Sequence, residues 1–162
     1  MKMRSLIVGI ASLFVQQAIF AQTKPFVTKT NVTGFTLPEY SRLETCEVYL
    51  DKVVLTKKYG IYSETGFTTQ EERPVTISPS IKQILKAAIE ENLEETDNYL
   101  CDGPSTTVSS NFADSTSTLF ATGGCGSPRL ERVGGASQML MELVGSYCPV
   151  THDFGSEFGS IE

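Results

Sequence analysis

The first 21 residues constrain the fold most, because they predict the compartment in which the rest of the chain folds. Lys2 and Arg4 precede an apolar run over residues 6–15, and smaller residues follow. This order is typical of a secretory signal peptide, which we expect to be cleaved after Ala21. Gln16 ends the run well short of the about 20 apolar residues that cross a membrane. We therefore expect a secreted or periplasmic mature chain that makes no contact with the membrane.

Four cysteines remain after cleavage, and an oxidising compartment converts an even number of them most simply into disulfides. They are Cys46, Cys101, Cys125 and Cys148. No two are spaced as a Cys-x-x-Cys pair, and the single histidine, His152, lies in a Gly-rich tail. We therefore expect two disulfides that staple the fold, with no metal site and no cofactor.

The mature chain is acidic, which limits the partners that it can attract. Removal of Lys2 and Arg4 with the signal changes the formal net charge from −6 to −8. Such a surface repels nucleic acid and anionic lipid, and the chain has no Lys/Arg cluster interleaved with aromatic residues. We expect the partner to be a protein or a small ligand, and we do not expect nucleic acid.

The length that remains after cleavage suits a single domain. Residues 22–45 are polar and rich in threonine, and we expect them to form an extended N-terminal arm. The domain itself is expected over residues 46–149. Residues 150–162 contain few packing residues, so we expect a flexible C-terminal tail.

Strands are expected at the start of the domain, because residues 46–51 alternate between apolar and polar and a β-branched run follows at residues 53–56. A further strand is expected between Gly66 and Ile77. Pro74 cannot donate to a sheet ladder, so part of this strand should lie at an edge of the sheet.

The first helix is expected from Ser78 to about Glu95. Its apolar residues share one face at helical spacing, and Pro79 suits the first turn: Ile81, Ile84, Leu85, Ala88, Ile89 and Leu93 form the stripe. Several carboxylates crowd its C-terminal end, where the helix dipole disfavours negative charge. A solvated acidic surface explains them, and a divalent-cation site is the alternative, although EF-hand spacing is missing.

A hairpin is expected from two β-rich segments, residues 106–112 and 116–122, that flank a turn near Ala113. Cys101 and Cys125 are each 12 residues from that turn. Residues equidistant from a hairpin turn lie opposite one another, so these two cysteines are expected to pair. By elimination, Cys46 would pair with Cys148.

The segment from Gly123 to Gly135 is expected to be a Gly-rich loop, in which Pro128 stiffens the backbone beside Arg129. One interpretation is a plain connector, in which Arg129 and Arg132 are solvated or paired with carboxylates. The other is a speculative binding element formed by Pro128, Arg129 and Arg132. A second amphipathic helix is expected from Ala136 to Tyr147, ended by Pro149.

These elements predict an α+β fold: an antiparallel sheet with two amphipathic helices packed on one face, stapled by disulfides. Residues 46–95 and 101–147 each consist of strands followed by a helix, which suggests an internal duplication. The residue identities of the two segments do not support it.

No catalytic constellation is visible, so we expect a non-catalytic binding or interaction module of unknown ligand. Two alternatives remain open. One is a protease inhibitor that presents the Gly123–Gly135 loop with Arg129, since a rigid loop loses little entropy on binding. The other is a small extracytoplasmic enzyme that uses carboxylates, although no sequence motif supports it.

Overall fold

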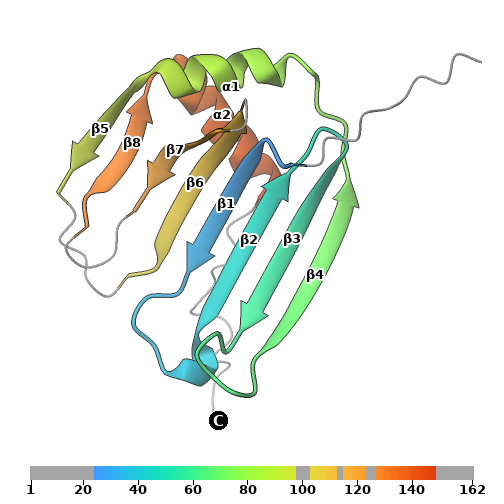
Figure 1. Ribbon diagram of the computed structural model, residues 1–162, viewed down its shortest axis with the longest axis vertical. Helices are drawn as coiled ribbons and strands as arrows, with labels where there is room; N and C mark the ends of the chain where they lie inside the picture. The colour runs from blue at the N-terminus through green and yellow to red at the C-terminus, as the bar shows by residue number, and fades with distance from the viewer. Residues whose placement is uncertain (1–23, 98–102, 113–114, 123–126, 149–162) are drawn as a thin grey trace, which may run out of the picture.

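The computed structural model describes residues 24–97, 103–112, 115–122 and 127–148. The expected signal peptide and C-terminal tail, together with Cys101 and Cys125, lie outside these residues. Within these residues, eight strands form one antiparallel sheet in the order β4-β3-β2-β1-β6-β7-β8-β5 (Figure 1). The predicted combination of an antiparallel sheet, two helices and a disulfide is confirmed.

The first half of the sheet is a meander of four strands. These are β1 (Val27–Val32), β2 (Arg42–Val48), β3 (Lys52–Tyr59) and β4 (Phe67–Pro74), with a short 3-10 helix, η1 (Pro38–Tyr40), between β1 and β2. β4 lies at the edge of the sheet, as Pro74 predicts, and every one of its residues is exposed. β1 lies near the centre, between β2 and β6, so residues 27–32 of the expected N-terminal arm form an inner strand of the sheet.

The second half places both helices next to strands. It contains α1 (Ile81–Glu90), β5 (Asn92–Thr96), β6 (Ser105–Phe112), β7 (Ser115–Ala121), β8 (Arg129–Val133) and α2 (Gly135–Tyr147). The expected hairpin is confirmed as β6 and β7, and the second helix is confirmed as α2. The first helix is shorter than expected, because it ends at Glu90, and Glu94 and Glu95 belong to β5 rather than to α1.

One face of the sheet carries the hydrophobic core. Val27, Val48 and Val53 lie side by side on β1, β2 and β3, and all three are fully buried. α2 crosses this face. The Ser137 hydroxyl in its first turn donates to the carbonyl of Arg132 on β8, and Cys148 at its end is bonded to Cys46 on β2. Buried side chains of both helices belong to the same core cluster: Ile81, Leu85 and Ala88 from α1, and Leu140 and Val144 from α2.

The opposite face of the sheet is polar. Thr56, Thr45, Thr30 and Thr107 form one row across β3, β2, β1 and β6. Antiparallel sheets tolerate a polar face, and β-branched threonine suits a strand. The threonine-rich sequence that suggested an arm is therefore the polar side of an inner strand.

The expectation that both helices pack on one face of the sheet is not confirmed. α1 contacts α2 and also β6 and β7. Since α1 connects β4 at one edge to β5 at the other, it runs along the ends of the strands, at the top of the view (Figure 1). α2 instead crosses the core face behind the strands in that view.

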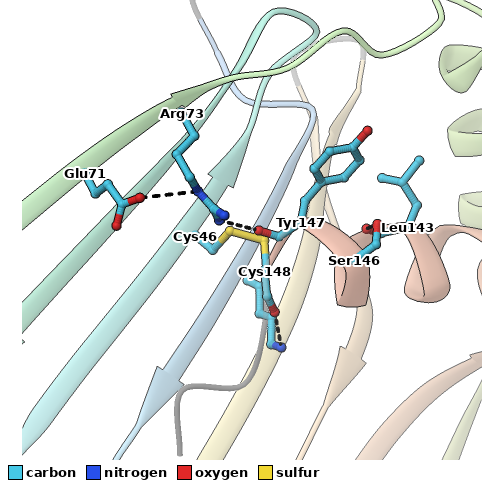
Figure 2. Close-up of a disulfide and its surroundings, with 8 residues drawn as sticks. Cys46, Glu71, Arg73, Leu143, Ser146, Tyr147 and Cys148 are labelled. Carbon is cyan, nitrogen blue, oxygen red and sulfur yellow. Dashed lines mark hydrogen bonds and ion pairs between the residues drawn. A yellow bond between two sulfur atoms is a disulfide. The ribbon is translucent and has the colours of Figure 1, made fainter.

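The Cys46–Cys148 disulfide confirms the pairing expected between these cysteines and joins β2 to the end of α2, across a sequence separation of 102 (Figure 2). Two cations lie beside it. Arg73 donates to the carbonyl of Tyr147 at 3.0 Å, and Lys29 donates to the carbonyl of Cys148 at 3.0 Å. Cations at a helix C-terminus compensate the carbonyl ends of the helix dipole, so covalent and electrostatic contacts fix the same turn.

Candidate functional site

Large apolar side chains gather on the surface at one end of the sheet. Among the described residues, the most exposed ones in this region come from the β1–β2 connection and from the β3–β4 hairpin, and we call them the aromatic tip: Phe35, Leu37, Tyr40, Tyr62 and Phe67. Phe35 is 93% exposed and Tyr62 is 71% exposed. Four of the five are aromatic. Both connections lie at the lower end of the sheet (Figure 1).

Ser41 holds the two connections of the aromatic tip together. It is fully buried, and its carbonyl accepts a hydrogen bond from the amide of Gly60 at 2.6 Å. Its hydroxyl donates to the carbonyl of Pro38 and accepts from the amide of Tyr62 at 3.3 Å. One buried serine therefore links the β1–β2 connection to the β3–β4 hairpin.

Two glycines shape the hairpin that carries Tyr62. Gly60 has a φ of +61°, a left-handed conformation that suits glycine. A Cβ atom on Gly66 would lie 2.5 Å from the carbonyl oxygen of Gly60, so no larger residue fits there without a backbone shift. Where β3 ends and β4 begins, Phe67 stacks on Tyr59 with ring centroids 4.6 Å apart. The guanidinium of Arg42 lies over the Tyr59 ring. The aromatic tip is thus supported by defined backbone geometry.

A buried lysine lines a small hollow on the core face. Lys29 donates to the carbonyl of Cys148. Burial lowers the pKa of Lys29, and the negative charge of Glu44 partly opposes this shift. Neighbouring Asn31 is buried and accepts a hydrogen bond from the hydroxyl of Thr106 at 2.9 Å. The cavity volume is about 30 Å³, room for about one water rather than for an organic ligand. Lys29 therefore helps to fix the end of α2, whereas Asn31 bonds to Thr106 on β6.

A larger hollow of about 270 Å³ lies between β7, β8 and the first half of α2. Its polar groups already bind one another. Arg132 donates to the carbonyls of Thr118 and Glu91 at 2.8 and 2.6 Å, and Ser137 donates to the carbonyl of Arg132 at 2.8 Å. This hollow therefore offers a ligand few polar groups that are not already engaged.

The residues that were expected to form a binding loop belong to a strand. β8 begins at Arg129, directly after Pro128, and is hydrogen-bonded to β7 and β5. Arg129 pairs with Glu131 at 2.7 Å and lies over the ring of Phe120. Arg132 is tied to backbone carbonyls. The expected Gly123–Gly135 loop is therefore wrong over residues 129–133, and this geometry does not support the inhibitor hypothesis.

The acidic cluster that was considered as a cation site is divided between elements. Glu94 and Glu95 lie in β5, whereas Glu91 turns toward the start of α2. Its carboxylate accepts hydrogen bonds from the amides of Ala136 and Ser137 at 2.8 and 2.9 Å, and from the Ser137 hydroxyl. Among the described residues, no group of three His, Cys, Asp or Glu side chains is arranged to hold a metal ion.

No known protein family, curated protein or solved structure matches this chain. In the part of the chain that the structure describes, no helix has the length and apolar character needed to cross a membrane.

The aromatic tip was missed by the sequence analysis. The signal was present, because Phe35, Leu37 and Tyr40 stand close together in a polar stretch that contains Pro38. Large apolar residues in such a connection have no strand face to bury them.

Proposed function

We propose that this chain is a secreted or periplasmic binding module that acts without catalysis and contacts a partner protein through the aromatic tip. The observation that supports the proposal is the exposure of four large apolar side chains on two connections that share the buried Ser41, with exposed Phe67 at the start of β4. Exposed apolar patches mark interaction sites in soluble proteins, and aromatic residues dominate the energetics of protein interfaces. The rigid support of the aromatic tip reduces the entropy lost on binding.

The charge of the aromatic tip favours a protein partner over an anionic surface. Glu39 and Glu64 lie within the two connections, and the mature chain carries a formal net charge of −8. Tyr40 and Tyr62 combine an apolar ring with a hydroxyl, which suits an interface that is partly wet. An apolar pocket or a flat apolar surface on another protein fits this chemistry.

Export supports the proposal from a second direction. The disulfide between Cys46 and Cys148 is the kind of crosslink that persists in an oxidising compartment. N-terminal sequencing of protein purified from its source should find a chain that begins at Gln22. A chain that still begins at Met1 would contradict export.

Site-specific photo-crosslinking tests the binding proposal. A photoreactive phenylalanine analogue is placed at Phe35, and the oxidised protein is irradiated with the extracellular fraction of its source. We expect a discrete covalent adduct with a partner protein, identified by mass spectrometry. The matched control carries the same analogue at Met139, which is 56% exposed but lies on α2, away from the aromatic tip.

The Met139 variant should give no such adduct. Replacing Tyr62 with Ser in the Phe35 variant should weaken crosslinking about 30-fold, since an interface hot spot contributes about 2 kcal/mol or more. Equal crosslinking from both positions, or none from position 35, would refute the aromatic tip as the binding site.

A further inference from the structure

β4 leaves one edge of the sheet open. All eight residues from Phe67 to Pro74 are exposed, and β4 pairs only with β3 within the sheet. An exposed edge presents unpaired backbone N–H and C=O groups to another strand. The other edge, β5, is shorter, with five residues.

The register with β3 shows which backbone groups of β4 point outward. The amide of Val75 donates to the carbonyl of Asp51 at 2.9 Å, and the register places these two residues opposite each other. Bonded and non-bonded pairs alternate along an antiparallel ladder. Every second residue from Val75 therefore bonds to β3, and Thr68, Gln70, Glu72 and Pro74 direct their backbone groups away from the sheet. Pro74, which has no N–H, fits such an outward position.

The outward residues of β4 are complementary to themselves in one antiparallel register. When Gln70 lies opposite Gln70 of a second copy, Thr68 lies opposite the second copy's Glu72, and Thr69 lies opposite its Glu71. Phe67 lies opposite the second copy's Arg73, whose guanidinium bonds to the Tyr147 carbonyl and pairs with Glu71 within its own chain. No carboxylate faces another carboxylate.

The neighbouring registers are less favourable. A shift of two residues in one direction places Glu71 opposite Glu71 of the second copy, and like charges directly opposite are destabilising. A shift in the other direction places Phe67 opposite Glu71 and shortens the overlap. The register centred on Gln70 pairs residues 67–73 of both copies, all but the last residue of β4.

We propose that β4 is a homodimer interface, at which a second copy of this chain adds its own β4 in antiparallel register about a two-fold axis at Gln70. The two sheets then form one continuous sheet. Because the strands are antiparallel, the aromatic tips of the two copies lie toward opposite ends of the dimer. The two proposals share Phe67, which belongs to the aromatic tip and is the first residue of β4.

A charge introduced at Gln70, on the symmetry axis, tests the proposal with the mature, oxidised protein. Sedimentation equilibrium in physiological salt should show a concentration-dependent monomer–dimer equilibrium for the wild-type chain. Gln70→Lys places two lysines opposite each other and should weaken dimerisation about tenfold or more. Gln70→Glu should weaken it similarly, whereas Gln70→Ala, which keeps the backbone donor and adds no charge, should dimerise like the wild type.

Mixing the Gln70→Lys and Gln70→Glu chains should restore dimers, because each lysine then faces a glutamate. This rescue separates a direct contact at the axis from a folding defect. A wild-type chain that stays monomeric throughout, a Gln70→Lys chain that dimerises normally, or a mixture that does not associate would each overturn the proposal. Crosslinking from Phe35 is measured separately, so this failure and failure of the binding proposal are distinguishable.

Discussion

At the scale of single residues, Glu91 resolves an apparent conflict between charge and helix dipole. It stands just beyond the C-terminal end of α1, where its backbone is already extended, and its carboxylate reaches the first turn of α2. A carboxylate at a helix N-terminus is stabilised by free amides and by the dipole. Gly134 permits this approach, since a Cβ atom there would collide with the Glu91 carboxylate.

The Glu91 cap predicts a pH dependence of stability. The hydrogen bond from the Ser137 hydroxyl, the amides of Ala136 and Ser137, and the charge of Arg132 lower the pKa of Glu91 from its ordinary value of 4.5. A lowered folded-state pKa stabilises the fold above the unfolded pKa, and this contribution is lost as the pH falls through the folded pKa.

Replacement of Glu91 with Gln should therefore reduce the free energy of unfolding at neutral pH by about 1 kcal/mol, because the cap is weakened. The difference between variant and wild type should shrink below pH about 4. Urea unfolding at several pH values measures it, and Glu90→Gln serves as the control on the same helix end. A difference that stays constant with pH would argue against the ionised cap.

The second disulfide is a prediction at the same scale. The β6–β7 hairpin stays paired as far as Thr106 and Thr122, whose backbones bond to each other at 2.8 Å. Cys101 and Cys125 follow shortly beyond these two residues on either strand. Peptide mapping without reduction should recover a Cys101–Cys125 linked peptide, and free thiols at both positions would contradict the pairing.

At the scale of elements, strong periodicity made some segments predictable. The apolar stripe of α2 and the β-branched hairpin of β6 and β7 were found because their patterns extend over many residues. β5 and β8 were missed because each has only five residues and carries charged side chains at alternate or adjacent positions. Their strand state comes from pairing with each other, which is a contact between distant segments.

The candidate site was less predictable than the fold. Exposure of Phe35 or Tyr62 depends on where the two connections lie in the folded sheet, and residue type alone does not show it. The pairing of Cys46 with Cys148 was predictable, because the hairpin argument left only one remaining pair. The commitment of Arg132 to the carbonyls of Thr118 and Glu91 required the three-dimensional arrangement of β5, β7 and β8.

The aromatic tip predicts that its two connections respond together to a change at Ser41. Ser41→Ala removes the acceptor for the Tyr62 amide and the donor to Pro38, at a cost of about 1–3 kcal/mol in stability. Hydrogen exchange at the amide of Tyr62 should accelerate, and crosslinking from Phe35 should weaken. Ser63→Ala, in the same hairpin, is the control, and equal effects from both variants would argue against a specific role for Ser41.

At the scale of the whole molecule, the end of α2 connects the two halves of the sheet. α2 starts beside β8 in the second half and ends beside β2 in the first half, where Cys148 is bonded to Cys46. Arg73 on β4 and Lys29 on β1 bind the last carbonyls of the same helix. Loss of the crosslink therefore affects contacts to three strands of the first half.

Cys46→Ala combined with Cys148→Ala should reduce the free energy of unfolding by about 2–5 kcal/mol, because the crosslink closes a long loop in the unfolded chain. Hydrogen exchange should increase most at the last turn of α2, whereas the amides of the β6–β7 hairpin should change little. Urea unfolding and native-state exchange measure the two effects. The reduced wild-type protein is the control for the lost sulfur packing, since it keeps both side chains but lacks the bond. Uniform acceleration of exchange across both halves would show instead that the crosslink stabilises the sheet as one unit rather than anchoring the end of α2.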